Sequence, residues 1–125
     1  MILDTCALLW LAGGSKKLSR AALKEINAAS VVNVSAISGF EMSLKTGAGK
    51  LKLSHPVEEW FKRVAEHHGL TILPLDLEAC IAAANLPPIH DDPFDRFIIA
   101  TAKLSDLTVV TADEQFEGYG LKVIC

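Results

Sequence analysis

Residues 90–102 read His-Asp-Asp-Pro-Phe-Asp-Arg-Phe-Ile-Ile-Ala-Thr-Ala, which predicts a loop that passes directly into a helix. Asp92 suits the N-cap position, and Pro93 suits the first helical position because its φ angle is already fixed near the helical value. The apolar residues from Phe94 to Ala102 recur at helical spacing. We therefore expect Asp95 in the first turn, beside the loop, with a buried helix face fixing its orientation.

Short apolar runs alternate with helical patterns along the rest of the chain. We expect strands at residues 1–3, 31–34, 70–73, 107–111 and 121–124. We expect helices near residues 5–12, 19–29, 35–45, 56–68, 77–85 and 93–102, and a short turn or helix from residue 112. This order predicts an α/β fold, a three-layer α/β/α domain with a short-stranded, mostly parallel five-stranded sheet. No repeat or linker interrupts the pattern, so we expect residues 1–125 to form one domain.

The composition narrows the class of protein. The formal net charge of −3 does not by itself indicate a nucleic-acid binder. Half of the residues are hydrophobic, but charges interrupt every run that could span a bilayer, so we expect a core and a protein interface. The first four residues lack the basic start of a signal peptide. Three cysteines without metal-ligand spacing favour a reduced, cytoplasmic setting.

Four acidic residues occupy comparable places in this pattern. Asp4 follows the first strand, Glu41 lies in the helix after the second strand, and Asp113 follows the fourth strand. Asp95 opens a helix that runs antiparallel to the strands and so begins at their carboxyl ends. Since ligands of open α/β sheets bind outside that edge, we expect the four carboxylates to converge there.

Each acid also has an ordinary explanation as a helix cap. Asp4 is a candidate N-cap, and capping boxes are possible for Ser38 with Glu41, for Asp92 with Asp95, and for Thr111 with Glu114. Taken singly, capping is the better explanation for each. Taken together, four acids at one sheet edge favour a site. In the helix that carries Glu41, we expect apolar contacts from Ile37, Phe40, Met42 and Leu44.

Crowded carboxylates suit a hard divalent cation, Mg²⁺ or Mn²⁺, which prefers oxygen ligands. Such an ion can activate water and stabilise the leaving oxygen of a phosphodiester. No cysteine or histidine near these acids has zinc-ligand spacing, and we expect His90, as a lone loop histidine, to be solvated rather than a ligand.

At this point the residues resemble a known family, the PIN-domain ribonucleases, and within it the VapC-like toxins of type II toxin–antitoxin pairs. The resemblance rests on four segments in order: residues 3–10, residues 34–41, residues 92–102 and residues 110–116. It implies that Asp4, Glu41, Asp95 and Asp113 are the catalytic, metal-binding acids, that Asp92 is a helix cap or a supporting group beside them, and that Thr111 orients Asp113 or a water. Phe40 and Thr101 depart from the family, in which Trp and Gln are common at these places.

The resemblance further implies a metal-dependent endoribonuclease acting on structured RNA, a homodimer, and inhibition by a cognate antitoxin. The apolar run from Leu8 to Leu11 is compatible with a partner surface and equally with the core. Lys45, Lys50 and Lys52 are compatible with phosphate contacts and equally with a solvated helix end.

Three other functions compete with this interpretation. A receiver-like regulator needs an acid pair after the first strand, where only Asp4 stands, and a haloacid-dehalogenase-like phosphatase needs an acid where Cys6 stands. A PIN fold that binds RNA or protein without catalysis is the third alternative, and its distinguishing property is tolerance of EDTA.

Overall fold

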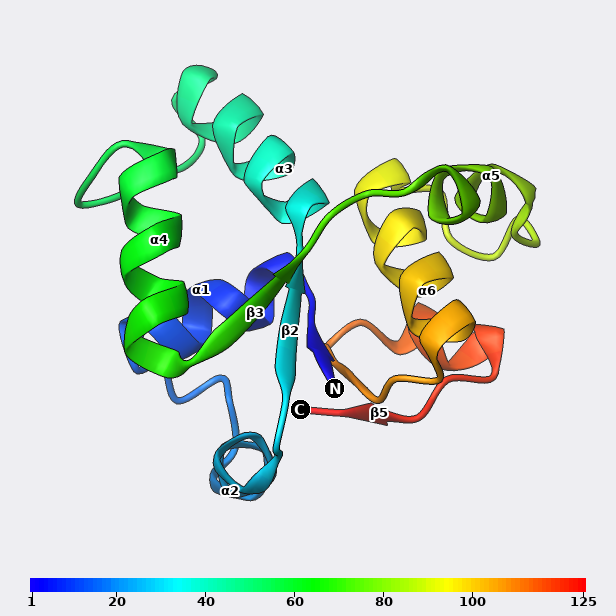
Figure 1. The fold of residues 1–125 in the computed structure, drawn as a ribbon, viewed down its shortest axis with the longest axis horizontal. Helices are drawn as coiled ribbons and strands as arrows, with labels where there is room; N and C mark the ends of the chain where they lie inside the picture. The colour runs from blue at the N-terminus through cyan, green and yellow to red at the C-terminus, as the bar shows by residue number, and fades with distance from the viewer.

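The computed structural model describes residues 1–125 and contains one five-stranded sheet flanked by helices (Figure 1). The strands are β1 (Ile2–Leu3), β2 (Val32–Ser35), β3 (Leu70–Leu73), β4 (Val109–Val110) and β5 (Val123–Ile124). The helices are α1 (Thr5–Gly13), α2 (Arg20–Ala28), α3 (Ala36–Gly47), α4 (Val57–His68), α5 (Leu77–Asn85), α6 (Pro93–Ser105) and the 3-10 helix η1 (Glu114–Tyr119). None of these helices combines the length and the apolar character that crossing a membrane requires.

All paired strands are parallel, in the order β3-β2-β1-β4-β5. The central strand β1 pairs with β2 on one side and with β4 on the other, so the strand order reverses between β1 and β4. Such a switch point is where open α/β sheets bind their ligands. The register places Leu3 opposite Val110. The residues that follow them, Asp4 and Thr111, therefore leave the sheet side by side.

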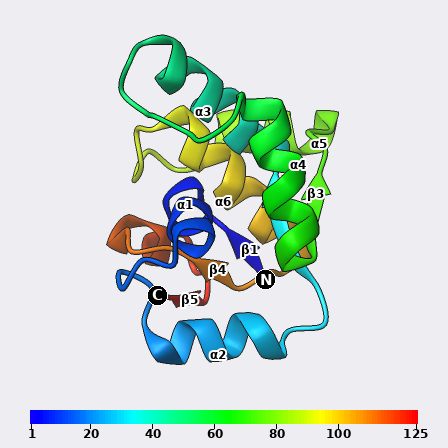
Figure 2. The same cartoon turned by 90° about the vertical axis from the view of Figure 1, so that its left-hand side faces the viewer.

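Two buried apolar clusters lie on opposite faces of the sheet, because successive strand side chains point to opposite sides. Leu3 and Val110 pack with residues of α1, α2 and α4, whereas Ile2 and Val109 pack with residues of α6 and η1. Figure 1 shows α1 and α4 to one side of β2 and α5 and α6 to the other, and Figure 2 shows α2 running below the sheet. The predicted three-layer α/β/α fold is confirmed, and the sheet is entirely parallel.

Helix α3 differs from its prediction in two respects. It begins at Ala36, where the Ser35 side chain accepts a hydrogen bond from the N–H of Ile37, so the capping box expected at Ser38 is wrong. The Ser38 hydroxyl instead lies 2.8 Å from that of Thr5. The buried face of α3 consists of residues 37, 38, 41 and 42. Phe40 and Leu44 are about half exposed, against the expectation that both pack inward.

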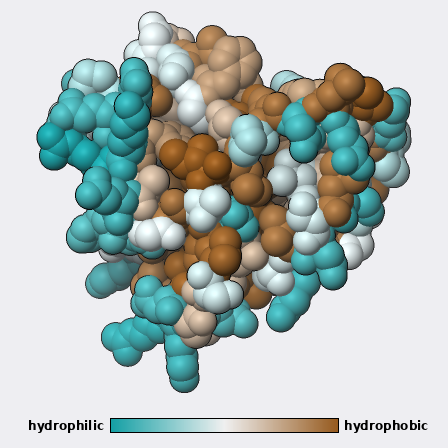
Figure 3. All heavy atoms as spheres, viewed as in Figure 1, coloured by the Kyte–Doolittle hydropathy of each residue, from teal (hydrophilic) through white to brown (hydrophobic).

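Exposed apolar side chains also occur on α5 and on the edge strand β3. Leu77 is 75% exposed and Ile81 54% exposed, and Ile72 of β3 is exposed as well. In Figure 3, apolar surface covers the centre of one face of the molecule and continues over α5. This amount of apolar surface on one face is more than scattered single residues provide.

The loop between α5 and α6 is held by one arginine and one tyrosine. The guanidinium of Arg96 donates hydrogen bonds to the backbone carbonyls of residues 83, 84, 86, 87 and 90, at 2.8 to 3.4 Å. The hydroxyl of Tyr119 donates to the Pro87 carbonyl and accepts from the N–H of His90. Arg96 therefore caps the carboxyl end of α5 and fixes the path of the loop into α6.

Replacing Arg96 with lysine should destabilise the protein, although the charge is kept. A lysine ammonium has three donors and cannot reproduce the planar fork that reaches five carbonyls. We expect Arg96→Lys to lower the free energy of unfolding by about 1–3 kcal/mol, measured by urea denaturation. Arg63→Lys, in an exposed i,i+4 pair with Glu59, is the matched control and should change nothing measurable. Equal effects of the two substitutions would contradict the role given to Arg96.

Candidate functional site

One pocket, of about 330 Å³, is lined by all four acids expected at the carboxyl edge of the sheet. Asp4 and Asp113 follow β1 and β4, Glu41 lies on the buried face of α3, and Asp95 lies in the first turn of α6. Thr5, Cys6, Trp10, Lys45, Asp92 and Ala112 complete the lining. The four acids thus meet at the switch point of the sheet.

Asp4 is held by two donors, one for each carboxylate oxygen. Its Oδ1 accepts from the N–H of Ala7, 2.7 Å away, which makes Asp4 the N-cap of α1. Its Oδ2 accepts from the hydroxyl of Thr111, which lies beside it through the β1–β4 register. The Thr111 hydroxyl also accepts from the N–H of Asp113. Asp4 therefore both caps α1 and lines the pocket, and Thr111 links it to Asp113.

Only one of the two carboxylate oxygens of Glu41 accepts a hydrogen bond. Its Oε2 accepts from the ammonium of Lys45 at 2.6 Å, one turn further along α3. Its Oε1 is buried and has no hydrogen-bond partner. A buried carboxylate oxygen without a donor is costly, because burial has removed the water that would otherwise solvate it. Oε1 of Glu41 is therefore free to bind a cation.

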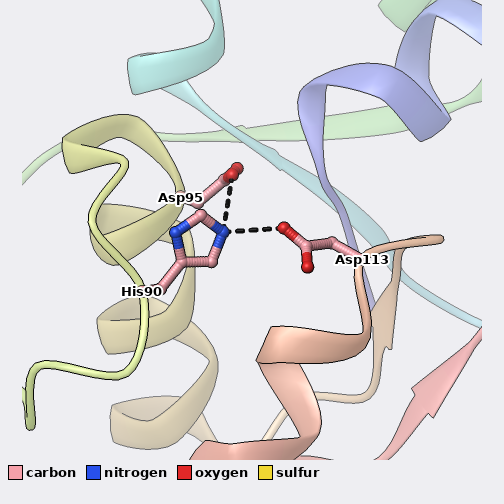
Figure 4. A group of neighbouring side chains, drawn as sticks. All are labelled: His90, Asp95 and Asp113. Atoms are coloured by element: carbon pink, nitrogen blue, oxygen red, sulfur yellow. Dashed lines mark hydrogen bonds and ion pairs between the residues drawn. The ribbon is translucent and has the colours of Figure 1, made fainter.

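Asp95 and Asp113 meet at His90, which the sequence analysis did not assign to the site. Figure 4 shows the ring between the two carboxylates. Nε2 of His90 lies 2.7 Å from Oδ2 of Asp113 and 3.1 Å from Oδ2 of Asp95. The residue is only 6% exposed, so the expectation that it is solvated is wrong. The tertiary packing of the loop against Phe116 and Tyr119 buries it, and no local sequence pattern reports such packing.

The helix caps at this edge differ in part from the predicted capping boxes. Asp92 is the N-cap of α6 and accepts from the N–H groups of Phe94 and Asp95. Asp113, rather than Thr111, is the N-cap of η1 and accepts from the N–H of Gln115. The side chain of Asp95 makes no capping bond, so its carboxylate is directed to the pocket and His90.

Burial and like charge make ionisation of the site unfavourable. Burial, followed by the neighbouring Asp92 carboxylate, raises the pKa of Asp95 from 3.8 to about 7, against an opposing effect of His90. Burial also raises the pKa of Asp4, although its hydrogen bonds with Thr111 and Ala7 oppose the rise. The pKa of Lys45 is raised by its hydrogen bond with Glu41. Without a cation, Asp4 and Asp95 therefore keep their protons to higher pH than ordinary aspartates do.

The residues present fit a hard divalent cation. The donor set consists mainly of carboxylate oxygens, one of which, Oε1 of Glu41, is buried without a partner. Carboxylate oxygens of Asp95 and Asp113 also lie within 4.8 Å of each other, beside His90. A positive ion here would favour the charged forms of Asp4 and Asp95, which burial and the neighbouring carboxylates disfavour.

Comparison with known proteins agrees with this fold and its expected class. A family model described as the PIN domain matches residues 1–121. The chain is 31% identical over 120 residues to Ribonuclease VapC22 of Mycobacterium tuberculosis (strain ATCC 25618 / H37Rv), a match that covers 95% of this chain and 91% of that protein. The chain therefore belongs to the PIN-domain family and is VapC-like, as its four sequence segments predict.

Solved structures of low sequence identity share the fold. VapBC2 from Rickettsia felis, bound to a DNA fragment from its promoter, superposes with a TM-score of 0.71 at 15% identity, over 98% of this chain and 96% of that chain. DNA-bound VapBC from Salmonella typhimurium superposes with a TM-score of 0.68 at 23% identity, over 98% and 95%. Both similarities extend over essentially the whole chain.

Removing the charge of Asp95 should stabilise the metal-free protein in a pH-dependent way. The folded pKa of about 7 exceeds the ordinary 3.8, so the folded state loses stability as the pH rises through this interval. In EDTA, we expect Asp95→Asn to raise the free energy of unfolding by about 1–3 kcal/mol at pH 8 and by progressively less as the pH falls toward 4. Urea denaturation across this range measures the difference.

Asp91→Asn is the control for that experiment, because Asp91 is an exposed carboxylate in the same loop. It should have little effect at any pH. A stabilisation by Asp95→Asn that does not depend on pH would contradict the electrostatic explanation.

Proposed function

We propose that this protein is a metal-dependent endoribonuclease toxin of a toxin–antitoxin pair, with Asp4, Glu41, Asp95 and Asp113 as its catalytic, metal-binding acids. The observation that carries the proposal is the convergence of these four carboxylates on one pocket at the switch point, with one buried oxygen left unpaired. The similarity to a VapC ribonuclease supports the same reaction class. Residues 1–125 would act as a single PIN domain.

Mg²⁺ or Mn²⁺ is the cofactor that these ligands favour, held by the four acids. When bound, such an ion polarises a phosphoryl oxygen and lowers the pKa of water for attack on an RNA phosphodiester. The chain's own groups prepare the pocket. Thr111 orients Asp4, and Lys45 offsets the charge of Glu41 where it borders the pocket. Lys50 and Lys52 are exposed and lie outside the pocket lining, so a phosphate contact is supported best for Lys45.

The alternatives lose support from the topology and the acids. A receiver-like regulator has the strand order 2-1-3-4-5, whereas this sheet has the order 3-2-1-4-5. A PIN fold that only binds RNA or protein does not require four converging carboxylates, of which Asp4 and Glu41 are buried at a cost in free energy.

Cleavage of RNA by the purified chain tests the proposed activity. Total cellular RNA incubated with Mg²⁺ or Mn²⁺ should yield discrete fragments on a denaturing gel, and EDTA should abolish them. Asp4→Asn and Asp95→Asn should each reduce cleavage by at least about 10³-fold while the chain stays folded, because each removes a metal-binding charge. Asp91→Asn, in the exposed loop, should cleave as the wild type does.

Cleavage that persists in EDTA, or in both purified site variants, would contradict the proposed chemistry. Metal binding without cleavage of any RNA would favour the PIN-fold binding module instead.

A cognate antitoxin is the proposed protein inhibitor. The structural neighbours described as VapBC complexes support this partner. A second, larger hollow of about 820 Å³ between α1, the loop at residues 51–55 and α4 offers a place for it. Leu9, Leu53 and Trp60 contribute apolar surface to this hollow, and Arg63 and three histidines border it. Leu8 and Leu11 belong to the core, so only part of the apolar run in α1 remains for a partner.

We also propose a homodimer, acting in the cytoplasm, where the three unpaired cysteines would remain reduced. The exposed apolar side chains of Leu77 and Ile81 on α5 support association of two copies through this face. Residue pairs four apart lie on the same side of a helix, so these two form one continuous surface.

Charges placed on α5 should separate the copies. We expect Leu77→Glu combined with Ile81→Glu to convert a dimer into a monomer by sedimentation equilibrium, without loss of helical content, because both side chains are exposed in the single chain. Ala28→Glu, at an exposed position of α2, is the control. A dimer that persists in the double variant would place the interface elsewhere.

A further inference from the structure

The hydrogen bonds of His90 define which of its ring nitrogens carries the proton. The backbone N–H of Asp92 points at Nδ1 from 3.1 Å, and an N–H group can only donate, so Nδ1 accepts. The proton of the neutral ring is therefore on Nε2. That nitrogen faces Oδ2 of Asp113 at 2.7 Å and Oδ2 of Asp95 at 3.1 Å. One N–H group is thus shared between two carboxylates from different elements of the fold.

The ring is fixed from several sides. The N–H of His90 donates to the Tyr119 hydroxyl at 2.8 Å, and its carbonyl accepts from Arg96 at 3.1 Å. The ring meets the fully buried Phe116 edge to face, with centroids 5.7 Å apart. Since both backbone groups and the ring are held, His90 presents Nε2 at one position with little freedom to follow the carboxylates.

The other two acids of the pocket have side-chain donors of their own. Asp4 accepts from Thr111, and Glu41 accepts from Lys45. For Asp95 and Asp113, His90 is the sole side chain that donates to either carboxylate. Asp95 has no other donor, and Asp113 has only the N–H of Gln115, on its other oxygen. Without His90, two like charges would face each other across the pocket with nothing between them.

We propose that His90 is a positioning residue, which holds Asp95 and Asp113 together through Nε2–H so that both carboxylates face one divalent cation. This inference rests on the proposed metal site. Groups that donate hydrogen bonds to ligating carboxylates orient them and thereby raise metal affinity, typically by about 10–100-fold. His90 acts here through the two acids and need not touch the ion or the RNA.

Two amide substitutions separate the contacts of the ring. In His90→Gln, the amide nitrogen can reach the place of Nε2 and donate to the carboxylates, but nothing replaces Nδ1. In His90→Asn, the shorter amide reaches only the place of Nδ1, so it can accept from Asp92 but cannot reach the carboxylates. The pair distinguishes a role toward the acids from a role in shaping the loop.

Isothermal titration calorimetry at pH 7.5 tests the inference. The full chain, first stripped of metal with EDTA and then freed of EDTA, is titrated with Mn²⁺ alone. We expect His90→Asn to bind Mn²⁺ at least about tenfold more weakly than the wild type, and His90→Gln to remain closer to the wild type than to His90→Asn. Thermal unfolding of each variant in EDTA verifies that the chain is folded before titration.

Each remaining outcome overturns the inference. Unchanged or tighter Mn²⁺ binding by His90→Asn would mean that the imidazole does not assist the acids or competes with the ion for them. Equal losses of Mn²⁺ affinity in both variants, or a larger loss in His90→Gln, would mean that His90 acts by shaping the loop rather than through the two acids. Wild-type protein that binds no Mn²⁺ would overturn the metal site as well, whereas wild-type binding with an unaffected His90→Asn would overturn the positioning role alone.

Discussion

Repulsion between carboxylates in a partly buried pocket is the constraint around which this edge of the sheet is built. Burial disfavours each negative charge, and every further carboxylate adds to the cost. The structure opposes this with a different donor at each acid. Asp4 has a helix N-terminus and the Thr111 hydroxyl, Glu41 has the Lys45 ammonium, and Asp95 and Asp113 share the imidazole of His90. These donors hold the acids in place. They leave Oε1 of Glu41 without a partner, and they do not neutralise the combined negative charge of the carboxylates.

Helix capping and metal binding are two uses of the same geometry here. In a parallel sheet with antiparallel helices, the carboxyl ends of strands and the N-termini of helices lie along one edge. An aspartate at such a junction can cap its helix with one oxygen and present the other to the pocket, as Asp4 and Asp113 do. A capping pattern in the sequence is therefore no argument against a site at this edge, although it is no argument for one either.

The sequence predicted what depends on local chemistry or on topology. The cap at Asp92 and the order of strands and helices follow from neighbouring residues, and the convergence of four acids follows from the parallel sheet. It did not predict the role of His90, because the burial of that ring comes from Phe116 and Tyr119, more than twenty residues away. Phe40 and Leu44 were misplaced because the buried face of α3 follows residues 37, 38, 41 and 42, and these two side chains lie outside it.

The hydrogen bond between Asp4 and Thr111 joins residues 107 positions apart in the chain. Strand β1, the middle of the sheet, gains its second neighbour only when β4 pairs with it. During synthesis, Asp4 therefore gains its Thr111 donor only after most of the chain has been made, and closing so long a loop carries an entropic cost that slows folding. A nascent chain interrupted before β4 would carry Asp4, Glu41 and Asp95 but would lack Thr111 and Asp113, so its pocket would be incomplete.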